Sequence, residues 1–114
     1  LTIAFNYGGQ DEILDAVRRI ATDVQSGRMQ VSDITRETFA AHLATAGIPD
    51  PDLVIRTSGE KRLSNFLIWQ TAYSEFVFMD TLWPDFGELQ LTDAIRQYQA
   101  RDRRFGGRNI SAGE

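Results

Sequence analysis

Residues 52–79, "DLVIRTSGEKRLSNFLIWQTAYSEFVFM", carry the clearest strand signals of the chain. Two apolar runs rich in β-branched and aromatic side chains, residues 52–57 and 75–79, predict two buried strands. Between them, residues 64–73 have the composition of a mostly buried helix that Ser64 could cap. Strands separated by helices are typical of a parallel sheet with right-handed crossovers. We therefore predict an α/β fold, a parallel sheet with helices on both faces.

The chain before this stretch predicts a further strand and a helix. Residues 1–5, "LTIAF", form a continuous apolar run, as expected of a strand buried on both faces of a parallel sheet. From residue 11 to residue 25, apolar side chains recur at steps of three and four, which predicts a helix with one apolar stripe. Gly27 follows and is expected to end that helix.

Two more helices are predicted from their end signals. Thr35 can cap a helix that Gly47 stops. A last helix is expected to start at Thr92 or Asp93 and to run through Phe105.

Composition excludes several classes of function. The chain has 114 residues, enough for one small domain with a modest core. It has no cysteine and one histidine, which excludes disulfides, thiolate metal sites and histidine-rich metal clusters. With 12 basic and 16 acidic residues, it is a poor candidate for nonspecific nucleic-acid binding, so we expect no nucleic-acid partner. The absence of cysteine fits a cytoplasmic location.

A donor-rich loop, "RTSGEKRLS", follows the strand at 52–57. Ligands of open parallel sheets bind at the carboxyl ends of the strands, where this loop is expected to lie. Arg56 and Arg62 each offer a planar fork for phosphate oxygens, and Ser64 adds a hydroxyl donor. Gly59 lets the backbone come close to a ligand. The loop is thus a candidate diphosphate site.

The residues alone leave a second interpretation of this loop open. Arg56 and Arg62 could instead pair with Asp52, Glu60 or other nearby acids on an ordinary loop. Neither of the usual glycine-rich nucleotide motifs, GxxxxGK[ST] or GxGxxG, occurs in the chain.

Three stretches carry a resemblance to a known family: "LTIAFNYGG", residues 52–86, and "RDRRFGG". Together they resemble the carboxyl-terminal half of bacterial undecaprenyl diphosphate synthases, which are cis-prenyltransferases. The resemblance covers nearly the whole chain, although residues 10–50 match more in the pattern of predicted elements than in residue identity. It implies that residues 1–114 are the carboxyl-terminal half of a single domain whose amino-terminal half lies outside this chain.

The resemblance also implies an activity. Such enzymes condense isopentenyl diphosphate repeatedly onto farnesyl diphosphate, making cis double bonds, and the C55 product is the lipid carrier of cell-wall (peptidoglycan) synthesis. The implied enzyme is cytoplasmic, with peripheral contact at the inner face of the plasma membrane through its lipid product as a further expectation.

Site residues are implied in the same way. Arg56, Arg62 and Ser64 would hold the diphosphate of isopentenyl diphosphate, and Glu75 would help to position Mg²⁺. A hard dication prefers carboxylate and phosphate oxygens, which agrees with this role. Further side chains are expected to line the site, although the first four of them could equally form a simple turn: Asn6, Tyr7, Gly8, Gly9 and Glu60.

The arginine-rich end of the chain has two interpretations. From charge alone, the five arginines and one aspartate of residues 96–108 indicate a solvated helix face. By resemblance, however, Arg104, Phe105 and Gly106 match an arginine-X-glycine element that reaches into the partner subunit's substrate site. The resemblance therefore favours a functional tail and implies a homodimer.

Two departures from the family pattern qualify these expectations. Gln10 stands where members of the family often carry arginine, and the family's Asp-Gly-Asn motif, which holds the catalytic aspartate, is absent from the chain. We therefore expect this segment to need the amino-terminal segment of the same enzyme as a partner and to be inactive alone. A noncatalytic partner subunit or interaction module is the alternative.

Overall fold

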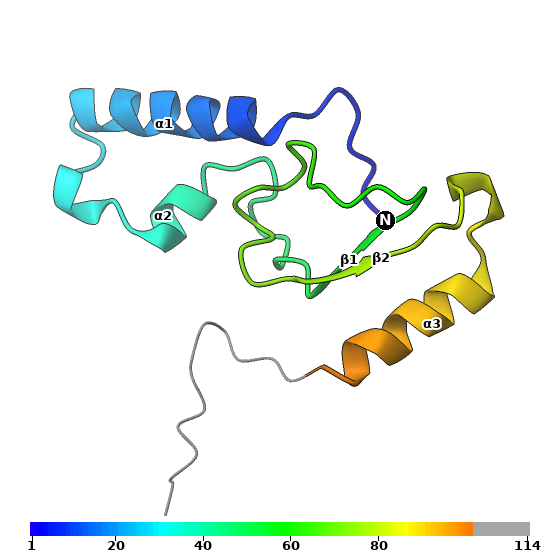
Figure 1. The fold of residues 1–114 in the computed structure, drawn as a ribbon. Coiled ribbons are helices and arrows are strands. Elements are labelled where there is room, and N and C mark those ends of the chain that lie inside the picture. Colours follow the sequence, from blue (N-terminus) through cyan, green and yellow to red (C-terminus); the bar gives the residue numbers. More distant parts are fainter. Residues whose placement is uncertain (102–114) are drawn as a thin grey trace, which may run out of the picture. The chain divides into compact units, whose positions relative to one another are not determined.

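The computed structural model describes residues 1–101 (Figure 1). The chain divides into two compact units. The first unit comprises Leu1–Pro51 and Leu63–Ala72, and the second comprises Asp52–Arg62 and the residues from Tyr73 onward. The elements follow one another as α1 (Gly9–Gln25), η1 (Val31–Asp33), α2 (Arg36–Ala40), β1 (Leu53–Arg56), β2 (Glu75–Phe78), η2 (Trp83–Asp85) and α3 (Glu88–Gln99).

The second unit contains the predicted parallel pair of strands. β1 and β2 run parallel, with Leu53 opposite Glu75 and Arg56 opposite Phe78. Val77 of β2 is only 1% exposed, and α3 packs against this strand. The prediction of an α/β fold with parallel strands is confirmed, because two apolar runs far apart in sequence pair side by side.

The first unit is organised around α1. Ala16 and Ile20 of its apolar stripe are buried, so the predicted helix is confirmed, with its start two residues earlier, at Gly9. Gly27 has a φ of 75°, the left-handed conformation that commonly ends a helix.

The predicted strand at residues 1–5 is wrong for this structure. These residues form no strand, and the large side chains of Leu1, Ile3 and Phe5 are exposed. Apolar and β-branched composition favours extended backbone, but a strand exists only where a neighbouring strand pairs with its N-H and C=O groups. No segment among residues 1–101 pairs with this run.

The helix expected from Thr35 to Gly47 is much shorter than predicted. Its start is right, since the Thr35 hydroxyl accepts a hydrogen bond from the Thr38 amide at 3.2 Å. α2 ends at Ala40, however, and tighter turns follow, in which several amides bond to the carbonyl three residues before them, as from Leu43 to Ala40. Gly47 therefore ends a run of turns and not a helix.

The predicted helix at residues 64–73 is also wrong. Ser64, Asn65 and Leu67 have φ values of 52°, 63° and 48°, which belong to the left-handed region and interrupt a right-handed helix. Ser64 therefore cannot act as an N-cap, a position that needs extended backbone. The segment instead makes turns, and Gln70 and Thr71 are buried in the first unit.

The last helix, α3, is displaced from its prediction. It begins at Glu88, ahead of Thr92, because Gly87 precedes it and donates its amide to the Gln90 side chain at 3.0 Å. It ends at Gln99, short of the predicted Phe105. Residues 102–105 of that prediction lie outside the described part of the chain.

Candidate functional site

The loop after β1 is tied to the segment after β2. The Ser58 amide donates to the Thr81 carbonyl at 2.8 Å, and the Gly59 amide donates to the Met79 carbonyl at 2.9 Å. Gly59 has a φ of 68°, and a Cβ atom there would lie 3.3 Å from an oxygen of Asp80. The donor-rich loop is thus anchored at the carboxyl edge of the strand pair, where the sequence predicted it.

Arg56 ends β1 at this same edge. Among residues 1–101 its guanidinium group has no ion pair or hydrogen bond. Its fork of N-H donors is therefore available to an anion.

Arg62 forms an ion pair with Glu60, so the acid-pairing interpretation of the loop holds for this arginine. The two side chains are 68% and 38% exposed. An ion pair this exposed contributes about 0–1 kcal/mol, because water screens the attraction. Arg62 can therefore exchange Glu60 for a more highly charged anion at little cost.

Ser64 belongs to the first unit, whereas Arg56 and Arg62 belong to the second. The structure gives the position of each side chain only within its own unit. The convergence of the three side chains on one diphosphate therefore stays a prediction.

Glu75 lies at the other end of the strand pair from the loop. It is the first residue of β2, opposite Leu53, and its carboxylate pairs with Arg101 at 2.9 Å. Three residue steps of about 3.3 Å separate it from the carboxyl edge. Within residues 1–101, no group of three or more acidic or histidine side chains is arranged to hold a metal ion. Glu75 offers one hard oxygen ligand but does not make a metal site alone.

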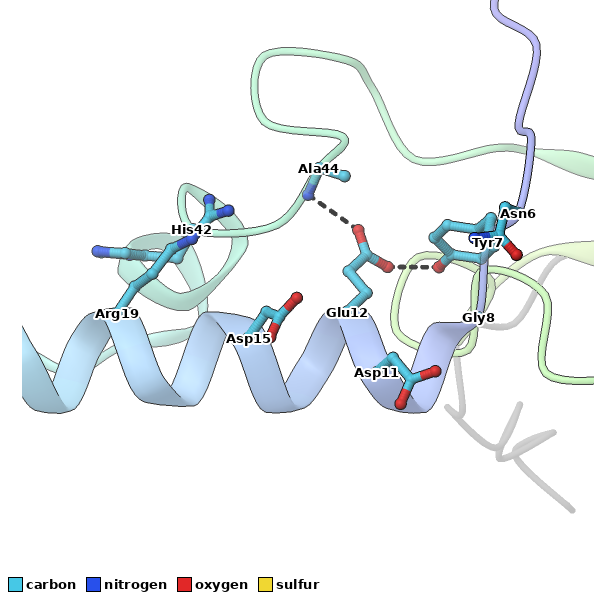
Figure 2. Close-up of a pocket in the computed structure, with 9 residues that line it drawn as sticks. All are labelled: Asn6, Tyr7, Gly8, Asp11, Glu12, Asp15, Arg19, His42 and Ala44. Carbon is cyan, nitrogen blue, oxygen red and sulfur yellow. Dashed lines mark hydrogen bonds between the residues drawn. The ribbon is translucent and has the colours of Figure 1, made fainter.

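The predicted lining residues Asn6, Tyr7 and Gly8 border a cavity of about 220 Å³ in the first unit, and Gly9 begins α1 beside them (Figure 2). The Tyr7 hydroxyl donates a hydrogen bond to the Glu12 carboxylate. Burial and this bond raise the pKa of Tyr7 well above its ordinary value. Asn6, Tyr7 and Gly8 therefore border a cavity, and their place in a substrate site stays a prediction.

Glu12 connects three segments of the first unit. Its carboxylate accepts hydrogen bonds from Tyr7, from the Ala44 amide at 2.9 Å and from the Gln70 side chain at 3.2 Å, and Figure 2 shows it reaching between Ala44 and Tyr7. Gln70, which is 3% exposed, also donates to the Thr45 hydroxyl at 2.9 Å. Sequence reasoning missed Glu12, because an acid in a first helical turn signals only a favourable helix-dipole position.

His42 is held between two acceptors. One ring nitrogen lies 2.7 Å from the Thr38 carbonyl and the other lies 3.1 Å from the Asp23 carboxylate. The doubly protonated ring satisfies both, so the Thr38 carbonyl and then Asp23 raise the pKa of His42. His42 and then Arg28 lower the pKa of Asp23.

These shifts define a pH window for the stability that the pair contributes. The His42 contribution is full below its unfolded pKa of about 6.5 and is lost as the pH rises through its raised folded value. The Asp23 contribution is full above about pH 4 and is lost as the pH falls through its lowered folded value. An NMR titration of His42, the single histidine of the chain, should give a midpoint above 6.5.

The Asp23→Asn variant should lower that midpoint, because it removes the negative charge beside the ring. Asp15→Asn is the control, since Asp15 lies on the same helix but pairs with Arg18. A wild-type midpoint at or below 6.5 would contradict the assignment.

Unusual backbone conformations gather in the predicted site segments. Among the described residues, the non-glycine residues with positive φ are Asn6, Ser58, Ser64, Asn65 and Leu67. Each lies in residues 6–9, in the loop after β1, or directly after that loop. Such conformations cost about 1–3 kcal/mol each and cluster at functional sites, so their placement supports the predicted site.

The predicted cross-dimer residues Arg104, Phe105 and Gly106 lie outside the described residues. None of the helices within residues 1–101 has both the length and the hydropathy of a bilayer-spanning helix.

The fold and the loop define the class: an α/β protein with paired parallel strands and, at their carboxyl edge, a loop that carries arginine and lysine side chains. Residues 1–106 match the family described as "Putative undecaprenyl diphosphate synthase". The chain belongs to this cis-prenyltransferase family.

Three relatives illustrate the match. The chain is 57% identical over 107 residues to an isoprenyl transferase of Rhizobium meliloti, covering 94% of this chain and 43% of that protein. It is 56% identical to the undecaprenyl-diphosphate synthase of Micrococcus luteus described as (2E,6E)-farnesyl-diphosphate specific, again over 94% and 43%. It is 51% identical to a geranylgeranyl-diphosphate-specific synthase of Thermoplasma acidophilum, over 93% and 41%.

A solved structure supports the fold assignment. Lavandulyl diphosphate synthase from Lavandula x intermedia, in complex with dimethylallyl diphosphate, matches with a TM-score of 0.84 and 48% identity. The match covers 88% of this chain and 43% of that one. The chain thus spans about two fifths of the length of the relatives it matches.

Proposed function

We propose that this chain is the carboxyl-terminal part of a cis-prenyltransferase that condenses isopentenyl diphosphate onto farnesyl diphosphate and yields undecaprenyl diphosphate for cell-wall synthesis. The observation that carries the proposal is the family match over residues 1–106. The donor-rich loop at the strand edge supplies the chemistry that such a substrate needs.

In this proposal Arg56, Arg62 and Ser64 bind the diphosphate of isopentenyl diphosphate. Arg56 has no competing partner among the described residues, and the exposed pair of Arg62 with Glu60 is weak enough to exchange. Two guanidinium forks and a hydroxyl match the several negative oxygens of a diphosphate.

These residues act by holding the substrate in place. In the condensation, the allylic C–O bond breaks, the electron pair of the isopentenyl double bond forms the new C–C bond, and the isopentenyl unit loses a proton. Fixing the diphosphate aims that double bond at the allylic carbon, which makes the encounter effectively intramolecular. The positive charge of the loop also offsets the negative charge that this bound diphosphate brings into the site.

Mg²⁺ is the cofactor we propose, and when bound it would neutralise diphosphate charge as a Lewis acid. Glu75 would contribute one carboxylate oxygen, which suits a hard dication. Within residues 1–101 Glu75 belongs to no group of three or more potential metal ligands, so the other ligands would come from the substrate or from residues beyond these. Mg²⁺ would also have to displace Arg101 from this carboxylate.

The allylic substrate and the assembly belong to the same proposal. Relatives of similar identity carry names that specify farnesyl or geranylgeranyl diphosphate, so family membership alone does not decide between the two. We further propose a cytoplasmic homodimer in which Arg104, Phe105 and Gly106 reach the partner's site, with only peripheral membrane contact through the lipid product.

The test is incorporation of labelled isopentenyl diphosphate by the complete protein that contains this segment, with farnesyl or geranylgeranyl diphosphate as the primer. We expect elongation that depends on Mg²⁺ and prefers farnesyl diphosphate, with a C55 product. A complete protein that binds a catalytic subunit but incorporates nothing alone would instead indicate a noncatalytic partner.

A further inference from the structure

Asn65 caps the amino end of α1 from a distant position in the chain. Its backbone carbonyl accepts a hydrogen bond from the Gly9 amide at 2.7 Å, and its side-chain oxygen accepts one from the Gln10 amide at 2.9 Å. Amides in a first helical turn have no partner within the helix. Gly8, the residue before α1, has no side chain that could cap it. Asn65 therefore supplies the cap that the local sequence lacks.

The conformation of Asn65 suits this task. Its φ is 63°, a left-handed value that asparagine tolerates better than most other residues with a Cβ atom. The contact is also close, since a Cβ atom on Gly9 would lie 3.0 Å from the Asn65 carbonyl and 2.9 Å from Ile68. The turn at residues 6–9 and the segment that contains Asn65 are thus fitted to each other within the first unit.

Ser64 directly precedes Asn65. It is exposed, has a φ of 52°, and makes no hydrogen bond with any residue in the 1–101 range. On its other side, the Leu63 carbonyl accepts a local hydrogen bond from the Phe66 amide at 3.2 Å. The bonds of Asn65 to Gly9 and Gln10 are therefore the nearest anchors of the Ser64 backbone to a distant segment.

We propose that Asn65 is a positioning residue that places the Ser64 hydroxyl beside the turn at residues 6–9, so that both face the diphosphate of the substrate. This inference rests on the proposed function, because it assigns Asn65 a purpose in binding isopentenyl diphosphate. Asn65 acts through Ser64 and the turn and need not touch the substrate.

The test compares three substitutions in the complete protein. Asn65→Gly tolerates the positive φ and keeps the backbone bond to Gly9, but it removes the bond to Gln10. Asn65→Asp keeps an acceptor for the Gln10 amide. Asn65→Ala removes the side-chain bond and also strains the backbone.

We expect the Asn65→Gly variant to raise the KM for isopentenyl diphosphate about tenfold, the equivalent of one hydrogen bond, with kcat changed by less than about twofold. Hydrogen exchange of the Gln10 amide should accelerate by a similar factor of about ten. Asn65→Ala should raise KM further, and Asn65→Asp should retain slow exchange at Gln10.

Thr35→Ala is the matched control, since it removes the cap of α2 and leaves the turn at residues 6–9 intact. Its KM should equal that of the wild type. If Asn65→Gly accelerates exchange at Gln10 but leaves KM unchanged, Asn65 is only structural and the inference is wrong. An inactive complete wild-type protein would contradict the proposed function, and this inference with it, whatever the Asn65 variants do.

Discussion

We expect Arg62→Ala to lower kcat/KM for isopentenyl diphosphate by about 30-fold to 1,000-fold in the complete protein, a loss of roughly 2–4 kcal/mol of transition-state stabilisation. The reason is that, in the proposed site, Arg62 binds phosphate oxygens through a planar donor fork that alanine lacks. Arg56 is the one other described residue of the loop with such a fork. The measurement is the initial rate of labelled isopentenyl diphosphate incorporation at several substrate concentrations.

Arg62→Lys refines this prediction, because it retains the charge but loses the bidentate geometry, and its rate should fall between those of the wild type and Arg62→Ala. Arg18→Ala is the matched control. Arg18 also carries an exposed guanidinium in an ion pair, with Asp15, but it lies on α1. Equal kcat/KM for Arg62→Ala and the wild type would remove the loop from the proposed site.

Glu60→Gln separates the two interpretations of the loop. If Arg62 serves mainly to pair with Glu60, Arg62→Ala and Glu60→Gln should have similar, small effects on the rate. If Arg62 binds diphosphate, Glu60→Gln should leave the rate nearly unchanged or raise it, because the competing carboxylate is gone.

Glu12→Ala should destabilise the protein by about 2–3 kcal/mol. The substitution removes the acceptor shared by Tyr7, the Ala44 amide and Gln70, and these partly buried donors then lack a full set of partners. Gln70 keeps its bond to Thr45, which limits the loss. Urea denaturation of wild type and variant measures the difference.

The control for this prediction is Asp15→Ala. Asp15 lies on the same helix, but its partner is the exposed Arg18, so the change in stability should stay within about 0.5 kcal/mol. The pKa of Tyr7 provides a second readout. It should fall in Glu12→Ala, since the hydrogen bond and charge of Glu12 no longer raise it, while burial still does. Equal stabilities for Glu12→Ala and Asp15→Ala would show that the network is not important.

The strands at 53–56 and 75–78 and the helix at 9–25 were predictable because each depends on a local pattern. Continuous apolar runs favour buried strands, and a three- and four-residue spacing favours an amphipathic helix. Arg56 and Arg62 could be selected as candidate anion ligands because the sequence shows which side chains carry donor forks, and their binding of an anion stays a prediction.

Residues 64–73 illustrate where such patterns fail. Their composition suits a helix, yet the contacts of Asn65 with Gly9 and Gln10 accompany left-handed backbone that a helix cannot contain. Residues 1–5 fail for a related reason, since a strand needs a partner that composition does not reveal.

The parallel α/β class, the helix α1 and the donor-rich loop all follow from the amino-acid sequence, because local periodicity and side-chain chemistry are sufficient for each. The cap that Asn65 gives to α1 and the three segments that Glu12 joins became visible only in the folded chain. These contacts depend on which distant groups the folded backbone brings within hydrogen-bonding distance, and no local pattern encodes that distance.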